Sequence, residues 1–442
     1  MSIEAEIHRL ENNVIDPATQ RAVRRTVLGG AVGSVVEFYE FSTYGVLAAT
    51  LAVVFFPTSD PTTGLLSTLA VFAVAFFARP IGGFFWGGLG DRIGRKRVLA
   101  FTIILMSIFT ALMGLLPTYA AIGVVAPIGL IVLRFLQGVS AGGEVSGAVS
   151  FIAEHSPPQQ RGFNVGMITV GAGAGTLLGT LIPSIMLLNL STEQMVEWGW
   201  RIPMLFALPL GVIGLYIRRR LDETPYFKAL ASEKKRAENP LKAALTGRAQ
   251  WKLLATAFFL TALNAASFYM LAGYLPSFAT ASLKLTGFQA LAPAVIAVSG
   301  AIVFEILAAW LSDRVGRKPV LLTAAIGHLL LAFPCFLLIS NGDFGLIVVG
   351  LLILSAPIGA YAGVTNPSLS ELFPTNVRVS GHGITYNLAV AVFGGSAPYL
   401  LVWLGAVTGS TLVGAVYLVI LSVVAIPAVL VMRERSRQPL QQ

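Results

Sequence analysis

The sequence predicts an all-α membrane protein with twelve transmembrane helices, arranged as two six-helix domains related by a parallel repeat. Composition is the first observation behind this, since 55% of the 442 residues are hydrophobic and 12% are charged, whereas soluble domains carry about 25% charged residues. The second is a series of twelve apolar runs, most of which reach the ~20 residues needed to cross a ~30 Å hydrocarbon core. The third is a pair of motifs that occurs in the same order in each half of the chain. Each run is expected to be helical because lipid offers the backbone no hydrogen-bond partners.

The chain opens with a polar segment, residues 1–25, in which Ile3, Ile7, Leu10 and Val14 repeat at helical spacing. This spacing predicts a short amphipathic helix on the membrane surface. A partly ordered tail fits the same composition, and the sequence does not separate the two.

The twelve apolar runs cover residues 27–56, 65–88, 98–116, 127–152, 163–188, 201–217, 252–275, 288–311, 319–339, 345–366, 382–404 and 410–432. The longest internal polar stretch, 218–251, lies between the sixth and seventh runs and holds nine basic and four acidic residues. We interpret it as a cytoplasmic linker with short surface helices. The expected domains are therefore 26–217 and 252–432, with a cytoplasmic tail at 433–442.

The positive charge follows the predicted topology. Nearly all of the 30 Lys and Arg residues fall at the termini or in loops on one side; Arg201 and Lys284 lie on the other side, and Arg79 and Arg134 lie within runs. Such asymmetry marks the cytoplasmic side, so both termini are expected in the cytoplasm and the protein in a bacterial cytoplasmic membrane. The net charge of +9 therefore indicates no nucleic-acid partner.

Cysteine and histidine usage gives no sign of a metalloenzyme. Cys335 is the only cysteine, and the four histidines have no metal-ligand spacing, so no intrachain disulfide or thiolate cluster is expected. We expect no cofactor other than the proton as a coupling ion.

The fifth run is rich in glycine, at Gly166, Gly171, Gly173, Gly175 and Gly179. Small residues let helices approach closely in membranes. They predict either a sliding surface between the two domains or tight packing, and one surface could serve both.

The repeated motifs carry a family resemblance. Residues 91–96 read Asp-Arg-Ile-Gly-Arg-Lys and residues 313–318 read Asp-Arg-Val-Gly-Arg-Lys. These turns, with Arg134-x-x-Gln137-Gly138 in the fourth run, resemble the major facilitator superfamily, whose fold has two parallel six-helix repeats. Residues 37–41 (Glu-Phe-Tyr-Glu-Phe), 140–144 (Ser-Ala-Gly-Gly-Glu) and 198–203 (Trp-Gly-Trp-Arg-Ile-Pro) resemble the metabolite:proton symporters. Residues 208–211 (Leu-Pro-Leu-Gly) and 221–225 (Leu-Asp-Glu-Thr-Pro) most resemble the proline/betaine members.

Six ionisable residues fall inside the predicted spans, where such groups are costly and usually functional: Glu37, Glu40, Arg79, Arg134, Glu144 and Glu305. Glu37, Glu40 and Tyr44 share one face of the first helix. Two of the acids depart from the family pattern, because Glu40 stands where an aspartate is usual and Glu305 where the relatives carry an uncharged residue.

The resemblance implies that helices one, four, seven and ten line a central cavity. Proton coupling is then expected from Glu37, Glu40, Glu144 and Glu305, with Arg134. Substrate contacts are expected from Tyr44, Arg79, Arg134, Gln137, Asn264, Tyr269 and Tyr361. Alternatively, Arg134 with Glu144, and Arg79 with a glutamate, form fixed ion pairs that lock the helices. Asn264 and the tyrosines fit packing or interhelical hydrogen bonds as well as substrate contact.

The repeated turns and a second repeated motif predict a gate. Glu154, Pro157 and Arg161 recur as Glu371, Pro374 and Arg378 with the same spacing. The resemblance implies that ionic clusters at the cytoplasmic helix ends latch the two domains together while the cavity faces outward. The residues expected in these clusters are Asp91, Arg92, Arg95, Glu154, Arg161, Asp313, Arg314, Arg317, Glu371 and Arg378.

These observations favour a proton-coupled symporter of a small organic metabolite that works by alternating access and acts as a monomer in the bilayer. The excess of acids over bases in the spans, with the resemblance, favours a zwitterion such as proline or betaine. A carboxylate symporter that uses Arg79 and Arg134 as clamps is the second interpretation. A passive facilitator or sensor remains open, and an enzyme is a distant third because no nucleophile–base or metal constellation is present.

Overall fold

The computed structural model describes residues 17–93, 95–220, 247–374 and 377–440. In these ranges it is helical, without a β-strand. Eleven helices are long and apolar enough to cross a membrane, and the bent pair α2 (Pro17–Val46) and α3 (Ala48–Phe55), which meet at 65°, makes a twelfth. The prediction of an all-α protein with twelve spans is confirmed, and helix α2 of the first span begins at Pro17, before the apolar run that starts at residue 27.

Six spans precede residues 221–246 and form the first half. After α2 and α3 come α4 (Pro61–Ile93), α5 (Arg95–Leu115), α7 (Val125–Ala141) with α8 (Glu144–His155), α9 (Arg161–Asn189) and α11 (Arg201–Arg219). Short helical segments join them: α6 (Tyr119–Ile122), η1 (Pro158–Gln160), α10 (Thr192–Gln194) and η2 (Met195–Gly199). The amphipathic helix expected in 1–25 and the surface helices expected in the linker fall mainly on residues outside the described ranges.

Six spans follow and form the second half. The seventh consists of α14 (Arg248–Tyr269), η3 (Met270–Tyr274) and α15 (Leu275–Ala281). Then come α16 (Gly287–Val315), α17 (Arg317–Ser340) and α18 (Phe344–Leu372). The eleventh consists of α19 (Arg378–Ala389), η4 (Val390–Gly395) and α20 (Ala397–Thr408), and the twelfth is α21 (Val413–Val431).

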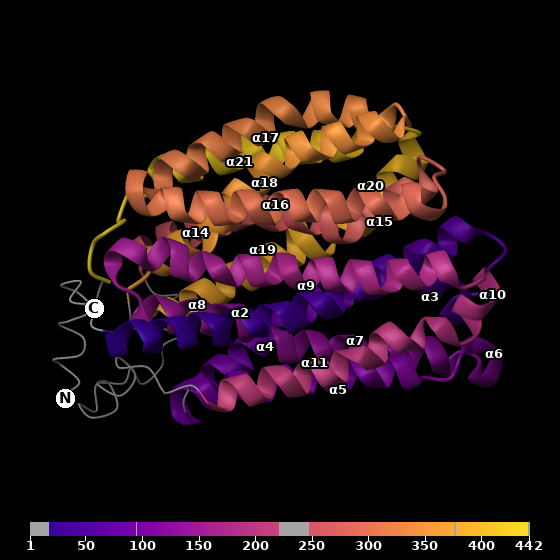
Figure 1. Ribbon diagram of the computed structural model, residues 1–442, viewed down its shortest axis with the longest axis horizontal. Coiled ribbons are helices and arrows are strands. Elements are labelled where there is room, and N and C mark those ends of the chain that lie inside the picture. The colour runs from indigo at the N-terminus through magenta and orange to yellow at the C-terminus, as the bar shows by residue number, and fades with distance from the viewer. Residues whose placement is uncertain (1–16, 94, 221–246, 375–376, 441–442) are drawn as a thin grey trace.

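The two halves lie side by side with their helices roughly parallel to the long axis (Figure 1). We call the end where α2 begins and α21 ends the terminal end, and the opposite end the far end. At the boundary, α9 of the first half runs along α16 and α18 of the second half. The repeat seen in the sequence therefore becomes two helical bundles facing each other.

The burial pattern is that of a protein surrounded by lipid. Large apolar side chains such as Leu330, Leu337 and Val431 are exposed on the outside, while five arginines are among the largest fully buried side chains. These are Arg79, Arg134, Arg218, Arg317 and Arg378. Charged groups inside and apolar groups outside are expected where the solvent is hydrocarbon.

The glycines of α9 divide between two partners. A Cβ at Gly175 would lie 2.9 Å from the Cα of Val35 of α2, so this glycine, with Gly171 and Gly179, packs the helix inside its own half. A Cβ at Gly173 would lie 2.6 Å from Ile302 of α16, so Gly173, like Gly166, faces the other half. Tight packing is therefore observed on both faces of the helix, and the sliding role of the face toward the second half stays a prediction.

Candidate functional site

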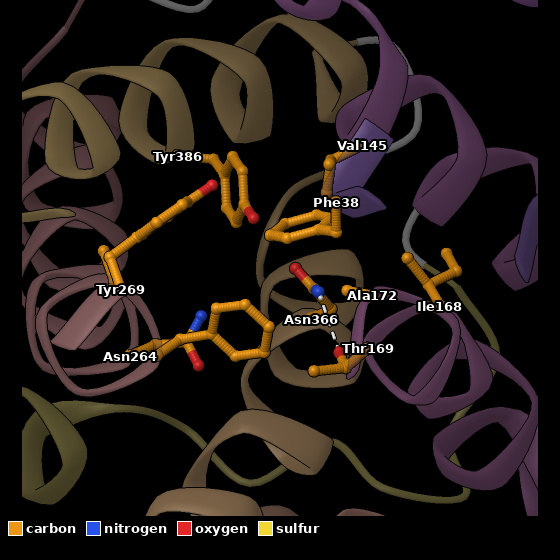
Figure 2. A pocket seen from close by; sticks show the side chains of 11 residues that line it. Phe38, Val145, Ile168, Thr169, Ala172, Asn264, Tyr269, Asn366 and Tyr386 are labelled. Atoms are coloured by element: carbon orange, nitrogen blue, oxygen red, sulfur yellow. Dashed lines mark hydrogen bonds between the residues drawn. The ribbon is translucent and has the colours of Figure 1, made fainter. Parts of the chain in front are cut away.

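A small cavity lies where the two halves meet, and eleven residues line it (Figure 2). From the first half come Phe38, Val145, Ile168, Thr169 and Ala172, and from the second Asn264, Ala265, Phe268, Tyr269, Asn366 and Tyr386. As far as the structure describes the chain, the lining is aromatic and amide-rich and has no charged side chain. The halves also meet on both sides of it, because Gly45 lies against the Ala272 backbone toward the far end and an ionic cluster closes the terminal end.

Aromatic rings form one wall of the cavity. Phe38 packs edge-on against Phe268, with ring centroids 5.2 Å apart, and stacks on Tyr269 at 6.0 Å. Tyr386 and Tyr269 enter from the second half, opposite Phe38 (Figure 2). The faces of such rings carry partial negative charge and attract cations within about 6 Å.

Several polar atoms at the cavity are unsatisfied. The Asn366 Nδ2 donates to Thr169 Oγ1 across the two halves at 3.2 Å (Figure 2). The Asn366 Oδ1, Asn264 Oδ1 and Tyr269 hydroxyl are buried and have no hydrogen-bond partner among the described residues. Buried polar atoms are usually satisfied, so a water or a bound ligand is expected to supply the missing partners. The structure thus brings the predicted Asn264 and Tyr269 to the cavity.

An ion pair adjoins the aromatic wall of the cavity. The Glu37 Oε1 of α2 lies 2.7 Å from Nη2 of Arg79 of α4, and both side chains are fully buried. The two charges touch, although their orientation does not give a good hydrogen bond. The Arg79 Nε donates to Asn387 Oδ1 of the second half at 3.3 Å, and its guanidinium lies 6.0 Å from the Tyr386 ring centroid. The pair therefore adjoins the cavity and connects the halves.

Glu40 is satisfied by neutral donors inside the first half. Its carboxylate accepts from Ser107 Oγ at 2.8 Å, Thr110 Oγ1 at 2.6 Å and Gln137 Nε2 at 2.8 Å. Arg134 donates to the Gln137 Oε1, and its guanidinium lies 4.0 Å from the Tyr44 ring centroid. The expected grouping of Glu40, Tyr44, Arg134 and Gln137 is observed, but these residues do not line the cavity.

Glu144 pairs with a base that the sequence interpretation placed in a loop. Arg218 of α11 forms a two-point contact with its carboxylate and also donates to Leu99 O at 2.6 Å. Thr102 Oγ1 donates to the same carboxylate at 3.0 Å. The alternative of an Arg134–Glu144 pair is wrong, because ten residues separate them, about 15 Å along a helix axis, and Arg218 occupies the carboxylate.

Tyr361 and Glu305 lie away from the cavity lining. Tyr361 is buried inside the second half, where its ring meets that of His328 at 6.0 Å. The expectation that Tyr361 faces the cavity is therefore not met in this conformation. Glu305 lies in α16 against the glycine face of α9.

Two reciprocal ion pairs close the terminal end. We call their four residues, together with Asp313 and Arg317, the terminal cluster. Arg161 of the first half contacts Glu371 of the second at 3.6 Å, and Arg378 of the second contacts Glu154 of the first at 3.5 Å. This reciprocal pairing across the two halves follows from the repeat, because the same motif in each half supplies one acid and one base. The predicted ionic contacts between the two halves are present for these four residues, and their gating role stays a prediction.

Asp313 provides a further link. Its carboxylate accepts the backbone N–H groups of Gly162 and Phe163, both at 2.8 Å, at the start of α9 in the other half. Arg317 bridges Asp313 at 2.9 Å and Glu371 at 3.0 Å. A carboxylate at a helix N-terminus is favoured by the exposed N–H groups and the helix dipole.

The remaining residues of the predicted gate fall into two groups. The guanidinium of Arg314 stacks on Trp310 at 3.7 Å rather than entering the terminal cluster. The side chains of Asp91, Arg92 and Arg95 lie outside the described residues, so their gating role stays a prediction.

Several site residues were not singled out from the sequence: Phe38, Thr169, Arg218, Asn366, Tyr386 and Asn387. Asn366 and Asn387 are amides inside apolar runs, a signal that could have found them. Arg218 heads the basic triplet 218–220, which is typical of a loop. Nothing in its local sequence marks it as buried.

Comparisons with known proteins agree with this arrangement. The family model described as Major Facilitator Superfamily matches residues 30–398 and, in a second match, 257–441. The chain is 35% identical to a proline/betaine transporter of Salmonella typhimurium, over 95% of this chain and 85% of that protein. It is 35% identical to a proline/betaine transporter of Escherichia coli, over 98% and 89% of the two chains. It is 36% identical to a glycine betaine/proline/ectoine/pipecolic acid transporter of Dickeya dadantii, over 95% and 85%.

Among solved structures, the fold resembles the proton:xylose symporter XylE bound to 6-bromo-6-deoxy-D-glucose. The TM-score is 0.79 at 17% identity, with 96% of this chain and 98% of that chain covered. At this identity the likeness concerns the fold alone.

Proposed function

The chain belongs to the Major Facilitator Superfamily, and on that premise we propose that it is a proton-coupled symporter of a small zwitterionic metabolite, such as proline or glycine betaine. Its curated relatives are transporters. Transport proceeds by alternating access, in which the two halves rock around the cavity between them. The protein spans the bacterial cytoplasmic membrane, with the terminal end in the cytoplasm.

The cavity lining is the observation that carries this proposal. The rings of Phe38, Tyr269 and Tyr386 suit a positively charged ammonium group, which aromatic faces attract. The absence of a lining charge suits a ligand whose own charges cancel, because a net charge in a buried site is costly without a partner. Unsatisfied amide and hydroxyl groups at Asn264, Asn366 and Tyr269 provide orientation.

Proton coupling follows from the Glu37–Arg79 pair. A substrate carboxylate next to the aromatic wall competes with Glu37 for the Arg79 guanidinium, which lies beside Tyr386. Once released, Glu37 is a buried carboxylate without a counterion and takes up a proton. Glu40 and Glu144 have satisfied oxygens within the first half, so we assign them and Arg134 to holding that half together.

The carboxylate-symporter alternative loses one of its two clamps in this arrangement. Arg134 is held under Tyr44 and by Gln137, away from the cavity, and only Arg79 adjoins it. A di- or tricarboxylate would thus bring more negative charge than one arginine balances.

A competition panel with purified protein in proteoliposomes tests the substrate class. Uptake of labelled glycine betaine should be inhibited by excess proline and betaine analogues and remain unaffected by citrate and 2-oxoglutarate. Empty liposomes are the control. Inhibition by dicarboxylates without inhibition by zwitterions would contradict the proposal and favour the carboxylate alternative.

A further inference from the structure

Glu305 differs from the other glutamates in the spans. It lies in α16 and is fully buried, and neither carboxyl oxygen has a hydrogen-bond partner among the described residues. Glu37, Glu40 and Glu144 each contact a base or neutral donors. At 1.5 Å per residue, Glu305 lies ~15 Å from the end of α16 at Val315, well inside the bilayer.

Two glycines close the space around Glu305. A Cβ on Gly173 of α9 would lie 3.3 Å from the Glu305 Oε2, and a Cβ on Gly363 of α18 would lie 3.0 Å from its Cα. Helix α9 therefore lies against the carboxyl group itself, and α18 lies against the Glu305 backbone, with no side chain from either glycine between them. Since α9 belongs to the first half and α16 to the second, the site lies in the interface between the halves.

Among the residues that the structure describes, no charged group on the surrounding elements contacts the Glu305 carboxyl group. The titratable residues on α16 and on the elements packed against it are Arg161, Tyr274, Asp313, Arg314, Arg317, Lys318, His328, Cys335, Tyr361 and Glu371. Of these, the permanently charged ones gather at the terminal end, and His328 and Tyr361 face each other. Within the described ranges, none of them is a hydrogen-bond or ion-pair partner of Glu305.

The cost of burial then decides the ionisation state. An uncompensated buried charge destabilises by about 3–5 kcal/mol or more, whereas an unsatisfied neutral polar group costs about 1–3 kcal/mol. The carboxyl group fits this interface only with its proton bound. We propose that Glu305 is a proton-binding site that must be occupied for the two halves to close on each other at the terminal end.

Opening of the interface changes this condition. Eight residues further along α16, Asp313 holds the start of α9, so release of that contact separates α9 from α16 at the level of Glu305. Water then reaches the carboxyl group and its proton can leave. The closed state holds one proton more than the open state, so rising pH favours opening by up to about tenfold per pH unit. This inference rests on alternating access as proposed above.

The test uses a thiol reporter that is hidden in the closed state. Ser146 of α8 is 4% exposed and faces Gly383 of α19 across the interface, toward the terminal end. Ser146→Cys in a Cys335→Ser background gives a single thiol, whose labelling by a soluble maleimide is measured without substrate from about pH 5 to about pH 9. At each pH, labelling is measured in the protein with Glu305 and in Glu305→Gln. The ionisation of the thiol itself then cancels in the ratio of the two.

The ratio of labelling, Glu305 over Glu305→Gln, should rise with pH by up to about tenfold per unit. A ratio that stays constant over the whole range overturns the proposal. If Glu305→Gln does not fold, Glu305→Met, which is apolar and of similar length, should show the same loss of pH dependence.

Glu40→Gln is the matched control, since Glu40 is also buried but is satisfied by donors within one half. Labelling of Glu40→Gln should keep the pH dependence of the parent. Loss of that pH dependence in Glu40→Gln would also overturn the assignment to Glu305. The labelling requires no substrate. A negative competition panel with a pH-dependent ratio would therefore reject the proposed substrate and leave the proton site standing.

Discussion

Replacement of Asp313 by Asn tests whether the terminal cluster holds the halves together. Asn has the same shape but offers one acceptor oxygen, so one of the two N–H groups of Gly162 and Phe163 loses its partner. A hydrogen bond to a charged group contributes about 1.5–3 kcal/mol. This contribution exists only while α9 and α16 touch, so the equilibrium should shift about 10- to 150-fold toward the state open at the terminal end.

The assay combines labelling of Ser146→Cys with thermal unfolding of the same variant. Labelling should increase by at least about tenfold, while ligand binding stays close to that of the parent. Asp343→Asn is the matched control, because Asp343 caps α18 by accepting from Leu346 N at 3.0 Å within one half. It should affect stability without affecting labelling. A lowered melting temperature of Asp313→Asn with unchanged labelling would refute the latch.

Three further results are expected. Tyr386→Leu should raise the KM for a quaternary ammonium substrate by about 2- to 30-fold, as expected for loss of about 0.5–2 kcal/mol of cation–π attraction, while Tyr386→Phe should stay near the parent; equal effects of the two would contradict the aromatic wall. Glu144→Gln should lower the free energy of unfolding by about 3–5 kcal/mol because it leaves Arg218 buried without its partner, and the pair of changes Glu144→Met and Arg218→Met should recover part of it in thermal unfolding. Burial raises the pKa of Glu434, but accepted backbone N–H groups, that of Lys318 foremost, hold the pKa below its usual range. The contact of the tail with α17 should therefore persist above the usual glutamate pKa and be lost as pH falls through the lowered pKa of Glu434. Hydrogen exchange of the tail should detect this acid sensitivity, and Glu434→Gln should abolish it.

The sequence predicted well those features that depend on local pattern or on the repeat. Run length and polarity define the spans, since a backbone in lipid must satisfy its own hydrogen bonds. The reciprocal pairs Arg161–Glu371 and Arg378–Glu154 could be anticipated because one motif occurs in both halves and the halves face each other.

Side-chain partners across helices could not be predicted in the same way. Helical spacing places residues on a face of their own helix, but it does not fix how that helix is rotated against its neighbours. Glu37 and Glu40 are three residues apart, yet one meets Arg79 near the cavity and the other meets Ser107 and Thr110 within the first half. Arg218 was missed for the same reason, because its burial depends on how α11 packs against α5 and α2.

Gradient-driven uptake tests the central claim of proton coupling through Glu37 most directly. In proteoliposomes that are alkaline inside, the parent should accumulate labelled glycine betaine above the external concentration, and a protonophore should abolish this accumulation. Glu37→Gln removes the titratable group with little change of shape, so accumulation should be lost while exchange of labelled for unlabelled substrate continues. Glu40→Gln, measured in parallel, should still accumulate substrate. Normal, protonophore-sensitive accumulation by Glu37→Gln would contradict the account.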